Sequence, residues 1–361
     1  MTQRLAFARA AYESVSLYDP KRAPVALDLT DNTNLWGMPP AAERAMREIP
    51  VASVTRYPTL YGTELKRALA DYVGVIPDMI VTGCGSDDIL DSAMRAFGTP
   101  DDLIVGSDPS FAMIPIFAQM NGLRWRPVVE LPMAARSVAP MPQPDVDALL
   151  AARARIIYLC SPNNPTGSLI ARAHIERVVR EADGVVFIDE AYAEFAGVSS
   201  VDLLNHSDRL LIIRTMSKAF GLAGLRIGYA VGQPALVREV EKSRGPYKVN
   251  AIAERVALAA LQHDRGWIDT HVALAVAVRE RLAGELRTIG LSPMGSAANF
   301  VCVPMPNAVA VGQALRTRGI AARPFPALPL VGDALRISVG PWPVLEQLLA
   351  ALAPAMAEAN R

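Results

Sequence analysis

The sequence predicts an α/β protein: a mainly parallel seven-stranded sheet with helices on both faces, followed by a smaller α+β domain. Two observations lead to this prediction. Short apolar and β-branched runs alternate with helical patterns through the first two thirds of the chain, which is typical of a parallel sheet. After about Gly245-Pro246 this alternation stops. The strand candidates of the first part are residues 79–82, 103–106, 124–129, 156–160, 185–189, 210–214 and 227–231.

The remaining elements follow in chain order. Residues 1–40 carry several prolines, which favours an irregular arm, and we expect it to pack with the small domain. The large domain is expected to span residues 41–245, with a Pro-rich surface linker at 139–144. Helices are expected between its strands at 87–97, 109–120 and 171–181.

The small domain is expected to span residues 246–361. It opens with two helical patterns, at 252–262 and 267–288. Strand candidates follow near 300–303, 320–323 and 335–339, and a last helix is expected at 344–357.

Composition narrows the class of protein. The 361 residues include 36 basic and 36 acidic side chains, and this balance argues against a partner with a negatively charged surface, whether nucleic acid or membrane. Three widely spaced cysteines and four unclustered histidines indicate neither a disulfide framework nor a metal site. The N-terminal residues lack the apolar core of a signal peptide. We therefore expect a cytoplasmic protein.

Lys218 lies in the most informative stretch, Thr215-Met-Ser217-Lys218-Ala-Phe-Gly-Leu-Ala-Gly-Leu-Arg226. A lysine amine attacks carbonyl groups only after it loses its proton, and burial or a neighbouring cation lowers its pKa. Thr215, Ser217 and Arg226 suit a phosphate dianion. A nucleophile for an aldehyde beside a phosphate site predicts pyridoxal 5′-phosphate as the cofactor.

Polar residues that follow other strand candidates fit the same ligand. Asp189 ends a buried strand, where a carboxylate needs a cationic partner such as a protonated pyridine nitrogen. The alternative, which is the commoner one in an arbitrary chain, is an aspartate that caps the next helix. Tyr192 stands three residues later and can donate to a ring oxygen. Asn164 lies in the rigid loop Ser161-Pro-Asn-Asn164-Pro-Thr-Gly167, where a structural Asx turn is the alternative.

A glycine turn supplies a second phosphate-binding segment. Gly85, Ser86 and Asp87 stand between a strand and a helix, where free backbone amides and the helix dipole favour an anion. Phe111, near the start of another helix, can lie flat on a cofactor ring or belong to the core.

Together these motifs resemble those of class I/II, fold-type I aminotransferases, and most of all those of histidinol-phosphate aminotransferases. The likeness extends over nearly the whole chain. It implies that Lys218 forms a Schiff base with the cofactor and moves the proton, that Asp189 pairs with the pyridine nitrogen, and that Phe111 stacks on the ring. Asn164 and Tyr192 are expected to hold the ring oxygen. Residues matching the family's phosphate site are Gly85, Ser86, Asp87, Thr215, Ser217 and Arg226.

The resemblance also implies partners. Arg56-Tyr57-Pro58 is similar to a family segment whose tyrosine reaches the phosphate in the other subunit, so we expect a homodimer with shared sites. The small molecules expected are an amino donor and a 2-oxo acid acceptor such as 2-oxoglutarate. The residues that match substrate-binding positions are Tyr18, Asn34, Arg323 and Arg336.

Departures from the family's pattern leave the substrate open. Trp36 stands where a tyrosine is expected, and the stretch 325–332 is unusually apolar; both changes are expected near the substrate. Histidinol phosphate and aromatic amino acids are therefore both candidates. The same scaffold also serves decarboxylases of the threonine-phosphate type. A cofactor-sensing regulator is a third alternative, although the chain lacks a helix-turn-helix extension and a basic excess.

Overall fold

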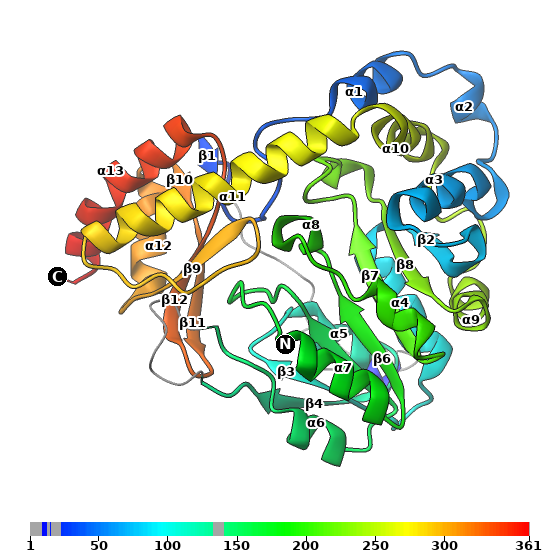
Figure 1. Ribbon diagram of the computed structural model, residues 1–361. Coiled ribbons are helices and arrows are strands. Elements are labelled where there is room, and N and C mark those ends of the chain that lie inside the picture. Colours follow the sequence, from blue (N-terminus) through cyan, green and yellow to red (C-terminus); the bar gives the residue numbers. More distant parts are fainter. Residues whose placement is uncertain (1–8, 13–14, 16–22, 133–140, 361) are drawn as a thin grey trace.

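The computed structural model describes residues 9–12, 15, 23–132 and 141–360. Two sheets organise these residues. Figure 1 shows the larger sheet in cyan and green and the smaller one in orange, with the long helix α11 (Arg265–Thr288) passing from the helices beside the large sheet to the small one.

The large sheet has seven strands in the order β2-β8-β7-β6-β5-β3-β4. Pairing is parallel from β7 through β6, β5 and β3 to β4, whereas β8 runs antiparallel to both β7 and β2. This confirms the mainly parallel seven-stranded sheet. Its strands are β2 (Ile80–Gly83), β3 (Leu103–Asp108), β4 (Arg124–Val129), β5 (Ile156–Cys160), β6 (Val185–Asp189), β7 (Leu210–Thr215) and β8 (Gly228–Gly232).

Central strands are apolar because both of their faces are covered. Every residue of β5, β6 and β7 is buried. One face packs against α4, α5 and α9, and the other against a second apolar cluster that includes α3, α7 and α10. The helices of this part are α1 (Pro40–Arg47), α2 (Ala52–Thr55), α3 (Thr63–Val73), α4 (Gly85–Phe97), α5 (Met113–Met120), α6 (Val146–Ala151), α7 (Arg172–Glu181), α8 (Ala193–Ala196) and α9 (Pro234–Arg244).

Short 3-10 turns link several of these elements. They are η1 (Ala10–Tyr12), η2 (Leu60–Gly62), η3 (Pro77–Met79), η4 (Val201–Asn205) and η5 (Ala223–Leu225). One predicted helix start is wrong: α5 begins at Met113 and not at 109, because β3 runs to Asp108 and the chain needs a turn before the helix.

The C-terminal part holds an antiparallel sheet in the order β11-β12-β9. The single strand predicted at 320–323 is in fact two, because the chain changes partner after Ala321: β10 pairs with β1, and β11 pairs with β12. The elements are α10 (Ala251–His263), β9 (Phe300–Pro304), α12 (Ala308–Thr317), β10 (Ile320–Ala321), β11 (Arg323–Leu328), β12 (Gly332–Ser338) and α13 (Trp342–Ala359).

The N-terminal segment lies against this C-terminal part. Its short strand β1 (Leu27–Asp28) pairs in parallel with β10. Beyond β1, the chain continues along β12, since Ser338 N donates to Leu29 O and Asn32 N donates to Ser338 Oγ. Residues 30–33 are thereby carried to the ends of the large sheet's strands.

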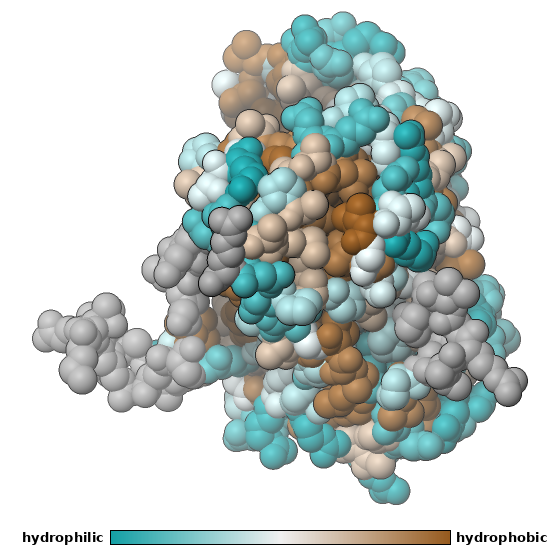
Figure 2. Space-filling model, turned by 90° about the vertical axis from the view of Figure 1, so that its left-hand side faces the viewer, coloured by the Kyte–Doolittle hydropathy of each residue, from teal (hydrophilic) through white to brown (hydrophobic). Residues whose placement is uncertain are grey.

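The molecular surface is mixed. Figure 2 shows the side on which the C-terminal part lies, with hydrophobic side chains exposed between hydrophilic ones, as is usual for globular proteins. Within the described residues, none of the helices combines the length and apolar character that a membrane span requires.

Candidate active site at the carboxyl ends of the strands

A cavity of about 470 Å³ lies where the large sheet, the N-terminal segment and the small sheet meet. The carboxyl ends of parallel strands face it, as expected for an α/β sheet. The predicted site residues that line it are Ser86, Asp87, Phe111, Asn164, Asp189, Tyr192, Thr215, Ser217, Lys218, Arg226, Arg323 and Arg336.

Lys218 follows β7 and reaches the cavity wall. Its Nζ donates a hydrogen bond to the backbone oxygen of Asp31 at 2.8 Å. Burial and, to a smaller extent, the nearby Arg336 guanidinium lower the pKa of Lys218 to about 8. A substantial fraction of the amine is therefore neutral near physiological pH, the state in which it is a nucleophile.

Asp189 ends β6 and is almost fully buried. Its Oδ1 accepts from Ala191 N at 3.0 Å and its Oδ2 accepts from Tyr158 Oη at 2.9 Å. Burial raises the pKa of Asp189 to about 6, although these two hydrogen bonds oppose the shift. A buried carboxylate at the cavity wall is an acceptor for a cationic N–H group.

Tyr192 and Asn164 lie on the same cavity and are tied to other parts of the chain. Asn32 Nδ2 donates to the Tyr192 hydroxyl at 3.0 Å, which leaves the phenolic proton free to point elsewhere. Arg336 Nη1 donates to Asn164 Oδ1, and the Asn164 Nδ2 group then remains as a donor. Two neutral donors are thereby available beside Lys218.

The start of α4 and the turn before β8 form the anion-binding end of the cavity. Arg226 Nη1 donates to Ser217 Oγ at 3.4 Å, and Ser217 N donates to Thr215 Oγ1 at 3.1 Å. Arg226 Nη2 also lies 3.7 Å from Asp87 Oδ2. Gly85 leaves room for the Arg226 side chain in this position, because a Cβ at residue 85 would lie 2.4 Å from Arg226 Nη2. Helix amides, hydroxyls and a guanidinium together suit a phosphate.

Arg323 and Arg336 line the opposite side of the cavity. They are register partners on β11 and β12, so two like charges stand directly opposite each other across the pair of strands. Such a pair is unfavourable unless an anion lies between or beside the two groups. The Arg336 Nε atom is buried and has no hydrogen-bond partner among the described residues.

Three residues named in the sequence analysis do not line this cavity: Asn34, Trp36 and Tyr57, the last of which was expected to reach the site of the other subunit. Tyr57 is 84% exposed and stacks on Tyr247 with ring centroids 5.0 Å apart. Asn34 bonds instead to Ala219 O and Trp36 N. Trp36, expected near the substrate, packs edge-on against His271 of α11. Tyr18 lies outside the described residues.

Other residues of the site were missed by sequence reasoning. Tyr158 contacts Asp189, Asn32 contacts Tyr192, and Asp31 bonds Lys218 through its backbone. Phe325 lines the cavity between the arginines, with its ring centroid 5.4 Å from Arg336 Cζ and 5.9 Å from Arg323 Cζ. Of these residues, only Phe325 could have been found from the sequence, because it lies in the apolar stretch 325–332 that was expected near the substrate.

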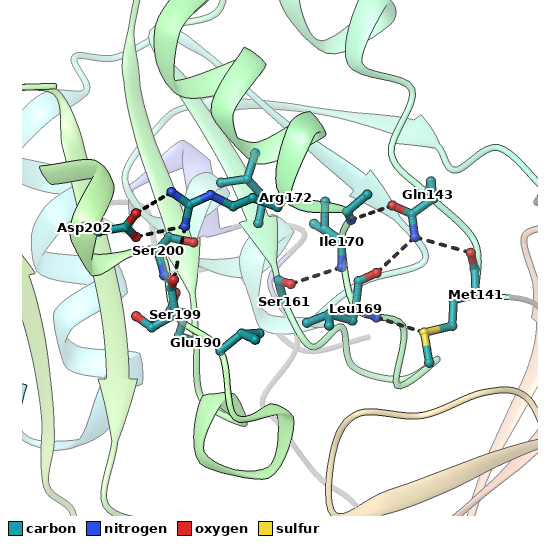
Figure 3. A pocket seen from close by; sticks show the side chains of 13 residues that line it. Met141, Gln143, Ser161, Leu169, Ile170, Arg172, Glu190, Ser199, Ser200 and Asp202 are labelled. Atoms are coloured by element: carbon teal, nitrogen blue, oxygen red, sulfur yellow. Dashed lines mark hydrogen bonds and ion pairs between the residues drawn. The ribbon is translucent and has the colours of Figure 1, made fainter. Parts of the chain in front are cut away.

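A second and larger cavity, of about 760 Å³, lies on the other side of the loop that follows Asp189. Figure 3 shows that its polar side chains are already paired: Arg172 with Asp202, and Gln143 with the backbone around Leu169. Glu190 is held by Arg214. Lys218 does not line this cavity, so we assign the chemistry to the smaller one.

The smaller cavity fits pyridoxal 5′-phosphate. It offers a partly neutral lysine for the aldehyde, a buried carboxylate for the ring nitrogen and a glycine-dependent anion site for the phosphate. Among the described residues, there is no cluster of three or more histidine, cysteine, aspartate or glutamate side chains suited to a metal ion. The lysine, the buried carboxylate and the anion site together form the donor set that an organic phosphate with an aldehyde requires.

Comparison with known proteins agrees with this chemistry. The family model "Aminotransferase class I and II" matches residues 25–352. The histidinol-phosphate aminotransferase of Thermoanaerobacter pseudethanolicus is 35% identical over 328 residues, covering 89% of this chain and 91% of the relative. That of Methylibium petroleiphilum is 37% identical over 366 residues, covering 98% and 95%.

A solved structure agrees in fold. The crystal structure of histidinol-phosphate aminotransferase from Sinorhizobium meliloti in complex with pyridoxal 5′-phosphate superposes with a TM-score of 0.86, at 24% identity, covering 99% of each chain. The predicted fold-type I architecture is thereby confirmed. The names of these relatives support amino transfer and not the decarboxylase alternative. The chain belongs to the class I and II aminotransferase family and is a pyridoxal 5′-phosphate-dependent enzyme of it.

Proposed function

We propose that the enzyme transfers the amino group of histidinol phosphate, or of a similar amino donor that carries a strong anion, to a 2-oxo acid such as 2-oxoglutarate. The opposed pair Arg323 and Arg336 carries this proposal. A phosphomonoester is close to a dianion at neutral pH, and two guanidinium groups match it better than they match a single carboxylate. The relatives' names give independent support.

The residues around the cofactor would divide the work. Bound pyridoxal 5′-phosphate supplies an aldehyde and an electron-withdrawing ring. We propose that Ser86, Asp87, Thr215, Ser217 and Arg226 hold its phosphate, with Gly85 giving them room. Asp189 binds the ring nitrogen, Asn164 and Tyr192 donate to the ring oxygen, and Phe111 covers a ring face.

Lys218 would carry the proton. Its Nζ is held at the cavity wall by Asp31 O, and its lowered pKa lets it take a proton from the substrate Cα and release it again. Arg336 and Arg323 would orient the substrate's anionic end, so that Cα faces this amine. We expect Lys218→Ala to fold and to lose turnover; transamination at the wild-type rate by the folded variant would contradict the assignment.

A half-reaction screen tests the substrate. The enzyme is mixed with histidinol phosphate, an aromatic amino acid, glutamate or threonine phosphate, and conversion of the cofactor to its amino form is followed by absorbance. We expect the fastest conversion with histidinol phosphate. Arg323→Gln should slow histidinol phosphate far more than histidinol, whereas Arg318→Gln, which loses a surface ion pair with Glu358, should change neither. Equal losses for both substrates would exclude a phosphate site at Arg323.

We also propose a homodimer with shared active sites. Exposed apolar side chains around α2 support it: Val51, Val54, Tyr57 and Leu60. A mixture of Lys218→Ala and Tyr57→Ala subunits, unfolded and refolded together, would contain hybrids with one native site. We expect activity above the sum of the two separate variants, up to about a quarter of wild type for random pairing. A mixture no more active than the sum, or a monomer by light scattering, would contradict sharing.

Two further expectations stay proposals. We propose that residues 41–245 and 246–361 form the large and small domains, with the arm at 1–40. We also propose a cytoplasmic location, as suits a small-molecule aminotransferase; fractionation of the source cells would test it.

A further inference from the structure

Tyr158 makes the one side-chain hydrogen bond to Asp189 that the described residues contain. It lies on β5, next to β6, with its backbone in register with Phe187, two residues before Asp189. The fully buried ring therefore extends along the sheet toward the cavity, and its hydroxyl meets Asp189 Oδ2 at 2.9 Å. Ala191 N holds the other carboxylate oxygen at 3.0 Å.

The direction of this hydrogen bond is determined by chemistry. A carboxylate only accepts, and burial together with the negative charge of Asp189 raises the pKa of Tyr158, so the phenol keeps its proton. With one donor on each oxygen, the carboxylate cannot rotate freely. Each oxygen still has a lone pair with which to accept from a further donor, and the cavity that Asp189 lines leaves space for such a group.

We propose that Tyr158 is a positioning residue, whose hydroxyl orients the Asp189 carboxylate and holds it in its charged form for the cationic nitrogen of the cofactor ring. This inference rests on the role proposed above for Asp189. It follows from opposing effects at that residue: burial favours the neutral acid, whereas a hydrogen-bond donor favours the carboxylate. The backbone turn after β6 supplies the first donor, Ala191 N, and the Tyr158 side chain supplies the second.

Other titratable groups around Asp189 must be considered in any pH measurement. They are Asp87 at the start of α4, Glu190 in the next position, Cys160 on β5, and Tyr192 and Lys218 at the cavity. Tyr158→Phe leaves all of these in place. It removes one oxygen atom and keeps the buried ring.

The test is the affinity of apo-protein for pyridoxal 5′-phosphate between pH 6 and 9, without turnover. We expect Tyr158→Phe to bind about tenfold more weakly than wild type near pH 6, since a hydrogen bond to a charged group is lost. The gap should narrow as pH rises, because Asp189 ionises without help at higher pH. Tyr229→Phe is the matched control: Tyr229 is equally buried, but its hydroxyl lies beside Arg214 on the other face of the sheet.

The variants separate two kinds of failure. Asp189→Asn should weaken the binding of pyridoxal 5′-phosphate at every pH. Its affinity should not show the dependence on pH that the ionisation of Asp189 causes, whereas Tyr158→Phe should show a stronger dependence than wild type. Normal binding by Asp189→Asn would overturn the role of Asp189 itself. Weak binding by Asp189→Asn, together with Tyr158→Phe curves parallel to those of Tyr229→Phe, would overturn the positioning role alone. Unfolding of each apo-variant in urea shows whether a loss of affinity comes from a loss of fold.

Discussion

Replacing Gly85 by alanine should weaken cofactor binding through Arg226, and a second glycine provides a matched control. Gly85 has φ +84°, and a Cβ there would stand 2.4 Å from Arg226 Nη2 and 3.1 Å from its Cζ. Gly74, at the C-terminus of α3, has the same φ of +84°, and among the described residues no heavy atom lies within 4 Å of its would-be Cβ. The two substitutions share the backbone penalty and differ in the collision.

The expected magnitudes follow from this difference. A left-handed conformation costs a residue with a Cβ roughly 1–2 kcal/mol, so both variants should lose a similar free energy of unfolding. The Arg226 guanidinium is the end of a flexible side chain and will move away. A charge-assisted hydrogen bond contributes about 1.5–3 kcal/mol, so Gly85→Ala should raise the cofactor dissociation constant roughly 10- to 100-fold.

Two measurements check the reasoning: urea unfolding of the apo-proteins and titration with pyridoxal 5′-phosphate. Gly74→Ala should be destabilised but bind normally. Gly85→Ala should lose affinity as well, and it should add little to the loss in an Arg226→Ala background, because the two changes act through one contact. Equal affinity of Gly85→Ala and Gly74→Ala would refute the role given to this glycine.

Two other predictions concern buried charges. Arg214→Met should reduce the free energy of unfolding by about 3–5 kcal/mol, because it leaves Glu190 buried without the cation now 2.8 Å away. Urea unfolding checks this: the double variant Glu190→Gln/Arg214→Met should lose less free energy of unfolding than the two single variants together. A loss below about 1 kcal/mol for Arg214→Met alone would contradict the pairing. Lys218 has a folded-state pKa lowered to about 8 from 10.5, so the folded apo-protein binds fewer protons than the unfolded chain between these values and gains stability as pH rises through this window. Lys218→Met should therefore have a free energy of unfolding roughly 1–3 kcal/mol higher than wild type at pH 7, allowing for the part of the amine that faces water. This difference should become smaller by pH 10. A difference that does not change with pH would show that the buried charge is not its cause.

Much of the candidate cofactor site was predictable because its residues stand at the ends of strands. Asp189, Thr215 and Asn164 follow or end runs in which every residue is buried, and parallel strands bring their carboxyl ends to one edge. Local pattern therefore predicted both the strands and the place where their polar neighbours meet.

The misses have a common physical origin. Tyr158 lies within an apolar strand, so its sequence pattern predicts a core residue. Its contact with Asp189 follows only from the register between β5 and β6. Asn32 lies in the N-terminal segment, 160 residues before Tyr192. Trp36 was expected near the substrate from its place in a motif, yet it packs on α11. Contacts between segments that are far apart in the sequence produce no periodic pattern from which they could be predicted.

The sequence by itself predicted the fold class and the cofactor, and it indicated Lys218 as the candidate nucleophile. These depend on local patterns: strand and helix periodicity, a lysine between hydroxyls, a glycine turn before a helix. Only the tertiary structure decided which groups set the charge and orientation of those residues. Asp31 O holds Lys218, Tyr158 holds Asp189, and β11 and β12 bring Arg323 opposite Arg336. Electrostatic interactions act through space over a few ångströms, and the chain brings these groups that close only when it folds.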